Sequence, residues 1–424
     1  MSHFLLDFRK RLSDMLLPVT DTITLSVRPR SATTLKSINH TFLLLSFIFY
    51  VLILASCSDS SNNESAATDD DSGVVVPEPI SFYYGADLSY VNEMEDCGAS
   101  YKNRSGAVQD PYSIFADEGT NLVRLRLWHN PTWTNYSNLQ DVKESIRRAK
   151  NEGMQVLLDF HYSDSWTDPE KQQIPAAWIA SIDDTTALGN LLYDYTFDTL
   201  SELAGENLLP NIVQVGNEIN PMILQDGELE WPIDWIRNAA LINKGIEAVR
   251  AVAQAENKEI EVMLHIAQPE NGLWWFEQAT DAGVTDYDWI GLSYYPIWSQ
   301  YDLNQVGTPL ASLINDYNKK LMIVETAYPF TMNNADAANN ILGQDALTGG
   351  FPASPQGQLD YLNRLQQVIE DAGGEGLVYW EPAWVSTGCS TQWATGSHWD
   401  NATLFDQNNQ ATLGMTFYNA TLDE

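Results

Sequence analysis

The chain has 424 residues, 44% of them hydrophobic and 11% aromatic, which is enough for one large globular domain or two ordinary ones. Its 57 acidic residues outnumber the 22 basic ones and give a formal charge of -35, which disfavours nucleic acid as a partner. The 14 tryptophans and 19 tyrosines favour a ligand with flat apolar faces, such as a sugar, although aromatic residues also fill protein cores.

The first 80 residues differ in composition from the rest of the chain. An uncharged apolar run at 42–56, FLLLSFIFYVLILAS, follows scattered Arg and Lys and is short for a membrane span, which predicts a signal peptide. It is followed by Cys57, and LASC resembles the lipobox of bacterial lipoproteins, so Cys57 is the predicted lipidation site; a plain membrane anchor is the alternative. We expect an N-terminal extension with a lipoprotein signal peptide over 1–56, an acidic disordered tether over 57–80 and one folded domain over 81–424.

From residue 82 onward, short apolar runs alternate with amphipathic stretches. Apolar residues at helical spacing predict helices at 138–153 and 235–254. Eight runs are typical of strands: FYYGADLS from 82, NLVRLRLW from 121, MQVLLDFH from 154, NIVQVGNE from 211, IEVMLHIA from 260, DWIGLSYY from 288, LMIVETAY from 321 and GLVYWEPAW from 376. Strand-then-helix units in this number predict an α/β fold, a single-domain (β/α)8 TIM barrel with its active site at the C-terminal ends of the strands.

Polar and aromatic side chains gather at the C-terminal end of every predicted strand. The set comprises Asp87, Arg126, Trp128, Asp159, His161, Asn217, Glu218, His265, Tyr294, Tyr295, Glu325, Trp380 and Glu381. A barrel mouth can hold such groups merely as salt bridges that satisfy one another, but a complete ring of them favours a catalytic face.

Two carboxylates of this ring, Glu218 and Glu325, end strands four and seven on opposite sides of the predicted barrel. Glycoside hydrolysis uses two carboxyl groups across a sugar: one protonates the leaving oxygen and the other meets the anomeric carbon. An apolar wall would raise the pKa of Glu218 and make it the acid, while Asn217 can donate to a sugar hydroxyl. A purely structural pair would need cations, and the mouth offers few beyond Arg124 and Arg126.

Several motifs also carry a family resemblance. NEI after strand four and VETAYPF after strand seven resemble the acid/base and nucleophile motifs of the glycosidase clan that has glutamates on these strands. YYGADLSYVNEMED, FADEGTNLVRLRLW, LLDFHYSDSWTDPEKQQIPAAW, GLSYYPIW and VYWEPAW resemble glycoside hydrolase family 53, the endo-β-1,4-galactanases. The resemblance spans about residues 82–406, and DFHYSDSWTDP is far longer than a chance match.

The resemblance implies roles for the residues nearest the reacting bond. Glu218 would be the acid/base and Glu325 the nucleophile of a retaining mechanism, with carboxyl groups about 5 to 5.5 Å apart. Arg126 would hold the nucleophile ionised with help from a tyrosine of strand six, Tyr295 in preference to Tyr294.

Further roles concern the substrate. Asn217 would contact the sugar 2-hydroxyl, and Trp380 would form an aromatic platform at the cleavage point, with Trp384 or Trp166 further along the cleft. Each tryptophan could instead pack in the core, least so Trp166, because SDSWTDPEKQQ is too polar to be buried. The remaining predicted substrate-binding residues are Asp87, Asp159, His161 and His265.

No metal or other cofactor is expected to be required. Some bacterial members of the family carry a calcium loop after strand seven, but the corresponding stretch at 331–350, TMNNADAANNILGQDALTGG, offers only Asp336 and Asp345 as carboxylates. Calcium prefers six to eight oxygens, so support for a calcium site is weak. The histidines His161, His265 and His398 are too dispersed for a zinc site.

Cys97 and Cys389 remain once Cys57 is set aside, an even number in a chain predicted to be exported. They follow strands one and eight, which a closed barrel makes neighbours. A disulfide between them is therefore predicted, with two buried thiols as the alternative.

These features predict a cell-envelope lipoprotein, at the surface or outer membrane. The family resemblance implies that it cleaves internal β-1,4 bonds in galactan and type I arabinogalactan side chains of pectin. We expect a monomer that meets the membrane only through its lipid anchor. A same-clan β-mannanase or β-glucanase is the enzymatic alternative. A non-catalytic glycan-binding protein is the alternative from another class, although such a protein has no use for an acid and nucleophile pair.

Overall fold

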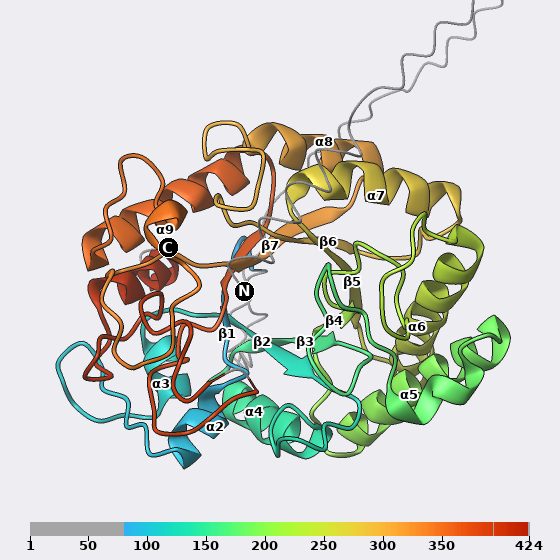
Figure 1. Cartoon of the computed structure of the whole chain (residues 1–424), viewed down its shortest axis with the longest axis horizontal. Coiled ribbons are helices and arrows are strands. Elements are labelled where there is room, and N and C mark those ends of the chain that lie inside the picture. Colours follow the sequence, from blue (N-terminus) through green and yellow to red (C-terminus); the bar gives the residue numbers. More distant parts are fainter. Residues whose placement is uncertain (1–79, 393, 423–424) are drawn as a thin grey trace, which may run out of the picture. The chain divides into compact units, whose positions relative to one another are not determined.

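A computed structural model describes residues 80–392 and 394–422, so the predicted signal peptide, Cys57 and the tether lie outside the described residues. The described part forms a closed barrel of parallel strands in sequence order, which confirms the predicted (β/α)8 class (Figure 1). The strands are β1 (Tyr83–Asp87), β2 (Leu122–Leu127), β3 (Gln155–Phe160), β4 (Ile212–Val215), β5 (Glu261–Ala267), β6 (Trp289–Ser293), β7 (Lys320–Thr326) and β8 (Gly376–Tyr379).

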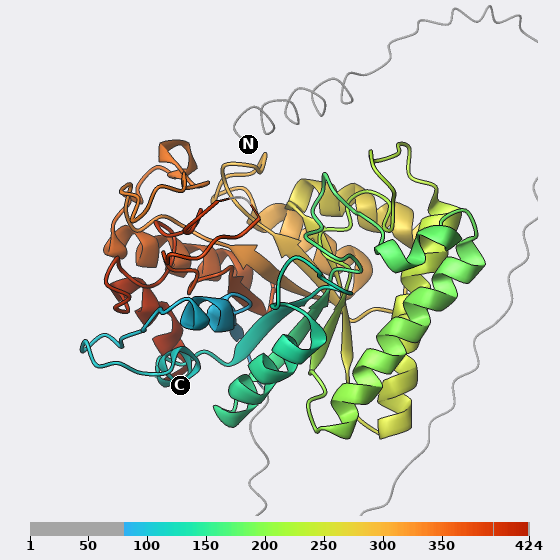
Figure 2. The same ribbon diagram turned by 60° about the horizontal axis from the view of Figure 1, so that its bottom comes forward.

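Helices surround this barrel, and α4, α5 and α6 run along its outside (Figure 2). The α-helices are α2 (Val91–Asp96), α3 (Pro111–Asp117), α4 (Leu139–Asn151), α5 (Thr185–Gly205), α6 (Trp235–Glu256), α7 (Pro269–Asp281), α8 (Gly307–Tyr317) and α9 (Pro355–Asp371). Short 3-10 helices are η1 (Ala176–Ser181), η2 (Gln344–Ala346) and η3 (Leu413–Leu422).

The two helices predicted from periodicity begin at side-chain caps. Asn138 accepts a hydrogen bond from the amide of Asp141 at the start of α4, and Asp234 accepts from the amides of Ile236 and Arg237 at the start of α6. Gly153, at φ +78°, stands just past the end of α4, where a left-handed residue is favoured. Helices α4 and α6 therefore lie within two residues of the bounds that the sequence predicts.

The barrel interior is divided into an apolar layer and a polar layer. Leu122, Leu157, Ile212, Met263, Trp289, Met322, Val324 and Val378 form a fully buried apolar cluster. Along β2 the side chains alternate, so Leu122, Arg124 and Arg126 point inward while Val123 and its equivalents pack against the helices. The apolar cluster thus closes one end of the barrel, and polar groups occupy the end where the strands finish.

A disulfide joins Cys97 and Cys389, with 5.8 Å between their Cα atoms, and confirms the predicted pairing. It links the segment after α2 to the loop after β8, which lie side by side in Figure 1 although 292 positions separate them. The first and last loops of the catalytic face are thereby held together.

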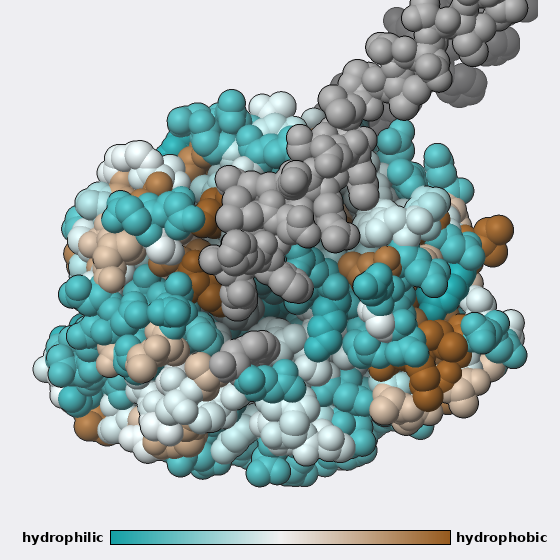
Figure 3. All heavy atoms as spheres, in the orientation of Figure 1, coloured by the Kyte–Doolittle hydropathy of each residue, from teal (hydrophilic) through white to brown (hydrophobic). Residues whose placement is uncertain are grey.

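No helix in the described ranges is long and apolar enough to cross a membrane. The face in Figure 3 is largely hydrophilic outside the grey region, with apolar patches scattered over it, as the excess of acidic residues implies.

Candidate active site

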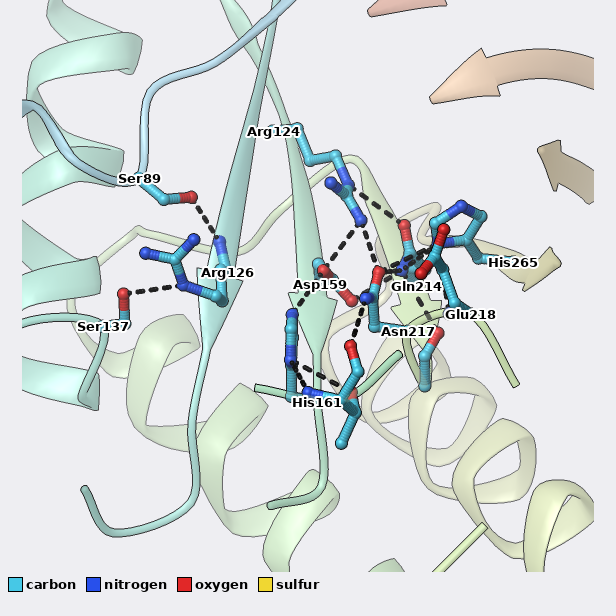
Figure 4. Close-up of polar contacts among 12 residues, drawn as sticks. Ser89, Arg124, Arg126, Ser137, Asp159, His161, Gln214, Asn217, Glu218 and His265 are labelled. Carbon is cyan, nitrogen blue, oxygen red and sulfur yellow. Dashed lines mark hydrogen bonds and ion pairs between the residues drawn. The ribbon is translucent and has the colours of Figure 1, made fainter. Parts of the chain in front are cut away.

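Arg124 of β2 is the centre of the polar layer and is 1% exposed. Its guanidinium uses all five hydrogen-bond donors: Nη1 donates to Asp87 (2.9 Å) and Glu325 (2.8 Å), Nη2 to Asp159 (2.9 Å) and Asn217 (2.8 Å), and Nε to Gln214 (3.2 Å). Figure 4 shows this side chain pointing toward Asp159, Gln214 and Asn217. One cation therefore balances three buried carboxylates and orients two amides.

The prediction that Arg126 holds Glu325 ionised is wrong, because Arg124 makes that contact. Arg126 stands two residues further along the same inward face and donates to Glu381 Oε1 at 3.0 Å and to Ser137 Oγ at 3.1 Å. In Figure 4 it lies apart from the cluster around Arg124.

The guanidinium of Arg126 also stacks on aromatic rings. Its carbon lies 4.0 Å from the ring centre of Trp166, 4.7 Å from that of Trp128 and 4.8 Å from that of Tyr90. Such contacts are favourable for a desolvated cation. Arg126 therefore supports the aromatic wall of the site and the end of β8, where Glu381 stands.

Glu218 and Glu325 lie close enough to influence each other's ionisation. Burial, and then the charge of Glu325, raise the pKa of Glu218 well above its ordinary value. Burial also raises the pKa of Glu325, to about 7, but the Arg124 guanidinium opposes that rise. The first proton that the pair binds therefore goes to Glu218, which suits an acid beside an ionised nucleophile.

Glu218 has a strained backbone and a hydroxyl partner. Its φ of +45° lies in the left-handed region, which is rare for a residue with a side chain and recurs at functional sites. Its Oε1 accepts a 2.6 Å hydrogen bond from Ser293 Oγ at the end of β6. The two glutamates thus have different partners, a hydroxyl for Glu218 and a cation for Glu325.

Four predicted substrate contacts form the buried support of these groups. Asp87, Asp159, His161 and His265 are at most 3% exposed. His161 Nε2 lies 3.1 Å from Asp159, and its Nδ1 accepts from the amide of Thr167, whose carbonyl in turn accepts from Asn217 Nδ2. The partners that the structure gives them are protein groups, and their contact with a substrate stays a prediction.

The two tyrosines of strand six point to different surroundings. Tyr294 donates to the carbonyl of Tyr301 and so faces away from the carboxylates. Burial and the charges of Glu325 and Glu218 raise the pKa of Tyr295 well above its ordinary value, so its phenol is near enough to both carboxyl groups to be affected by their charges. Tyr295 is therefore the tyrosine that can contact the nucleophile.

The tryptophans fall into two groups. Trp166 and Trp380 are half-buried, with ring centres 6.0 Å apart, and can offer a face to a sugar. Trp384 is 2% exposed and stacks on Tyr90 at 4.2 Å, so it backs the wall rather than extending the cleft. Trp399 packs edge-on against Trp380 at 4.7 Å and fixes its tilt.

The long loop after β7 is held by protein donors. Asp336 accepts from the amides of Ala338 and Ser397 and from the Ser386 hydroxyl, and Asp400 accepts from Asn340. Within the described ranges no group of three or more His, Cys, Asp or Glu is arranged to hold a metal ion. That the protein needs no metal stays a prediction.

Some residues of this site were not predicted from the sequence. Gln214 and Ser293 were not singled out, and Arg124 was named only as a possible cation. Two of them have a signal in the strand pattern: Gln214 is a polar residue two positions after inward-facing Ile212, and Ser293 stands two positions before Tyr295. Glu381 was placed in the ring but given no role.

A family model described as glycosyl hydrolase family 53 matches residues 83–418, nearly all of the described domain. The chain belongs to this family. It is 57% identical over 349 residues to an arabinogalactan endo-β-1,4-galactanase of Cellvibrio japonicus, covering 81% of this chain and 92% of that protein. It is 36% identical to an endo-β-1,4-galactanase of Bacillus subtilis, covering 75% of this chain and 76% of that protein.

Solved structures of family 53 agree with this assignment. The catalytic domain of the Ignisphaera aggregans family 53 protein matches with a TM-score of 0.74 and 30% identity, over 81% of this chain and 97% of that chain. A structure of fungal β-1,4-galactanases matches with a TM-score of 0.69 and 31% identity, over 79% of this chain and 98% of that chain. The family 53 chain described here is thus a glycoside hydrolase with its carboxylate pair at the mouth of the barrel.

Proposed function

We propose that this protein hydrolyses internal β-1,4-galactosidic bonds of galactan and type I arabinogalactan side chains of pectin, with retention of configuration. The observation that carries the proposal is that the two carboxylates have different partners: Arg124 donates to buried Glu325, and a serine hydroxyl donates to partly buried Glu218. The choice of substrate is supported by the galactanase names of relatives at 57% and 36% identity.

In this mechanism Glu325 attacks the anomeric carbon while Glu218 gives its proton to the leaving oxygen. Water then releases the glycosyl-enzyme intermediate, and Glu218 takes a proton from that water. Asn217 Nδ2 donates one hydrogen to Thr167 and has a second for the sugar 2-hydroxyl. Trp380 and Trp166 provide apolar surface for the sugar rings.

The decisive experiment measures reducing-end release from purified β-1,4-galactan, β-mannan and β-glucan, with product anomers followed by NMR. Selective cleavage of galactan with initial β products is expected, and Glu218→Gln and Glu325→Ala should each lower activity by several orders of magnitude. Inverted products would exclude the retaining mechanism. Preferred cleavage of mannan or glucan would favour the enzymatic alternative, and tight binding without cleavage would favour the glycan-binding one.

We further propose that the protein is a monomeric lipoprotein of the cell envelope, anchored through Cys57. The proposal rests on LASC after the apolar run at 42–56. Cys57→Ser should move the protein from the membrane fraction to the soluble fraction. Unchanged fractionation would refute lipid anchoring at this cysteine.

A further inference from the structure

Ser293 lies between the carboxyl group of Glu218 and the ring of His265. Its side chain is fully buried, with Oγ 2.6 Å from Glu218 Oε1 and 2.9 Å from His265 Nε2. A serine hydroxyl has one hydrogen and can donate to only one of these neighbours. The direction of its bond depends on which ring nitrogen of His265 carries a hydrogen.

The surroundings of His265 decide this question. Burial lowers the pKa of His265 well below its ordinary value, so the ring is neutral. Its Nδ1 faces two donors, the amide of Glu218 at 3.3 Å and Gln214 Nε2 at 3.1 Å. Asn217 Oδ1 lies 2.9 Å from Nδ1, but its two lone pairs already face two other donors, Arg124 Nη2 at 2.8 Å and Gln214 Nε2 at 3.2 Å. Nδ1 is therefore an acceptor, and the hydrogen is on Nε2.

With that hydrogen on Nε2, His265 donates to Ser293 Oγ, and the serine hydrogen is directed at Glu218 Oε1. We propose that Ser293 is a positioning residue for the acid/base: it keeps Oε1 of Glu218 as an acceptor, so that the catalytic proton is carried on Oε2. This inference rests on the proposed function, in which Glu218 protonates the leaving group.

The proton balance is simple. In the first step the hydrogen on Glu218 Oε2 passes to the glycosidic oxygen as the bond to the anomeric carbon breaks. In the second step Oε2 takes a hydrogen from the attacking water. The Ser293 hydrogen stays on Oγ in both steps and points at an oxygen that accepts whether the carboxyl group is neutral or ionised.

Ser293 also affects the proton affinity of Glu218, because its hydroxyl stabilises the carboxylate form. The groups that face Glu218 are Glu325 of β7, Asp168 after β3, Arg124 of β2, His265 of β5 and Tyr295 after β6. Among these, Glu325 and Asp168 raise the pKa of Glu218, and Arg124 and the Ser293 hydroxyl lower it. Without Ser293, the carboxyl group should keep its proton to a higher pH.

The test compares Ser293→Ala with Ser163→Ala in the otherwise intact enzyme. Ser163 is also fully buried, in the loop after β3, and its hydroxyl accepts from the amide of Ser165 rather than contacting the glutamates. The two substrates are β-1,4-galactan and a galactobioside with a dinitrophenyl leaving group, which departs without protonation. Thermal unfolding of both variants is measured first.

On galactan, Ser293→Ala should lower kcat/KM by about 10- to 100-fold and move the basic limb of its pH profile upward by about one unit. On the dinitrophenyl substrate kcat/KM should change less than about threefold. Equal losses on both substrates, or a basic limb that matches Ser163→Ala, would overturn the inference.

Two further measurements distinguish a failure of this inference from misfolding of the Ser293→Ala variant and from a failure of the proposed function. Nitrogen-15 NMR of the wild-type protein should show His265 neutral with hydrogen on Nε2; hydrogen on Nδ1 would overturn the proposed bond direction whether or not Ser293→Ala folds. Glu218→Gln should abolish galactan cleavage. If Glu218→Gln stays active, the proposed function fails; if it is inactive while Ser293→Ala matches Ser163→Ala, only the role of Ser293 fails.

Discussion

Replacing Arg124 with lysine should move the acidic limb of the pH–rate profile upward and lower stability. Arg124 Nη1 donates to Glu325 Oε1 at 2.8 Å, and its positive charge opposes the effect of burial on the pKa of that carboxyl group. Lysine keeps the charge but loses the planar fork that reaches partners on several strands. The nucleophile should then hold its proton to a higher pH.

The size of the stability loss and of the pKa shift in Arg124→Lys follows from the number of hydrogen bonds that lysine cannot make. The guanidinium of Arg124 makes five hydrogen bonds, three of them to carboxylates, whereas an ammonium has three donors. Losing two bonds should cost roughly 2 to 5 kcal/mol of unfolding free energy. Loss of the bond to Glu325, at about 1.5 kcal/mol, corresponds to an upward shift of about one pKa unit, which lowers the fraction of ionised nucleophile about tenfold at a pH well below the wild-type pKa.

The assay is kcat/KM on galactan from pH 4 to pH 9, with thermal unfolding measured in the same buffers. Arg126→Lys is the matched control, because Arg126 is on the same face of β2 but donates to Glu381. It should lower stability while leaving the acidic limb in place. An unchanged acidic limb in a folded Arg124→Lys protein, or equal shifts in both variants, would refute the assignment of Arg124 as the partner of the nucleophile.

Three other changes test separate parts of the structure. Burial raises the pKa of Glu218, so the contribution of its protonated form to stability is complete at low pH and is lost as the pH rises through the folded-state pKa. The melting temperature of Glu218→Gln minus that of the wild type should therefore increase from pH 5 to pH 8. A difference that stays constant over this range would contradict the expectation. Replacing Cys97 and Cys389 by serine should cost up to about 4 to 5 kcal/mol in calorimetry, because the disulfide closes a very long loop, and an unchanged melting temperature would argue against the bond in solution. Trp380→Ala should raise KM for galacto-oligosaccharides more than it lowers kcat; a pure kcat effect would remove it from the binding platform.

The strand ends could be predicted from the sequence because each strand is a short apolar run that finishes on a polar or aromatic residue. The barrel then followed from the strand–helix alternation, and its closure placed Cys97 beside Cys389. The choice between Arg124 and Arg126 could not be made in this way. Both occupy the same face of β2, and only the stagger of the neighbouring strands decides which one reaches Glu325 and which reaches Glu381.

Glu218 and Glu325 have different proton affinities, and the short motifs that contain them do not predict this difference. NEI and VET each supply a carboxyl group at the end of a strand, and neither contains the group that sets its proton affinity. Arg124 comes from β2 and Ser293 from β6, so each partner is distant in sequence from the glutamate it contacts. Two chemically identical side chains acquire different pKa values only when the barrel closes and the inward faces of these strands meet. A sequence that kept both motifs but lost Arg124 would therefore keep the appearance of a retaining glycosidase, while the pKa of its nucleophile would rise toward that of the acid.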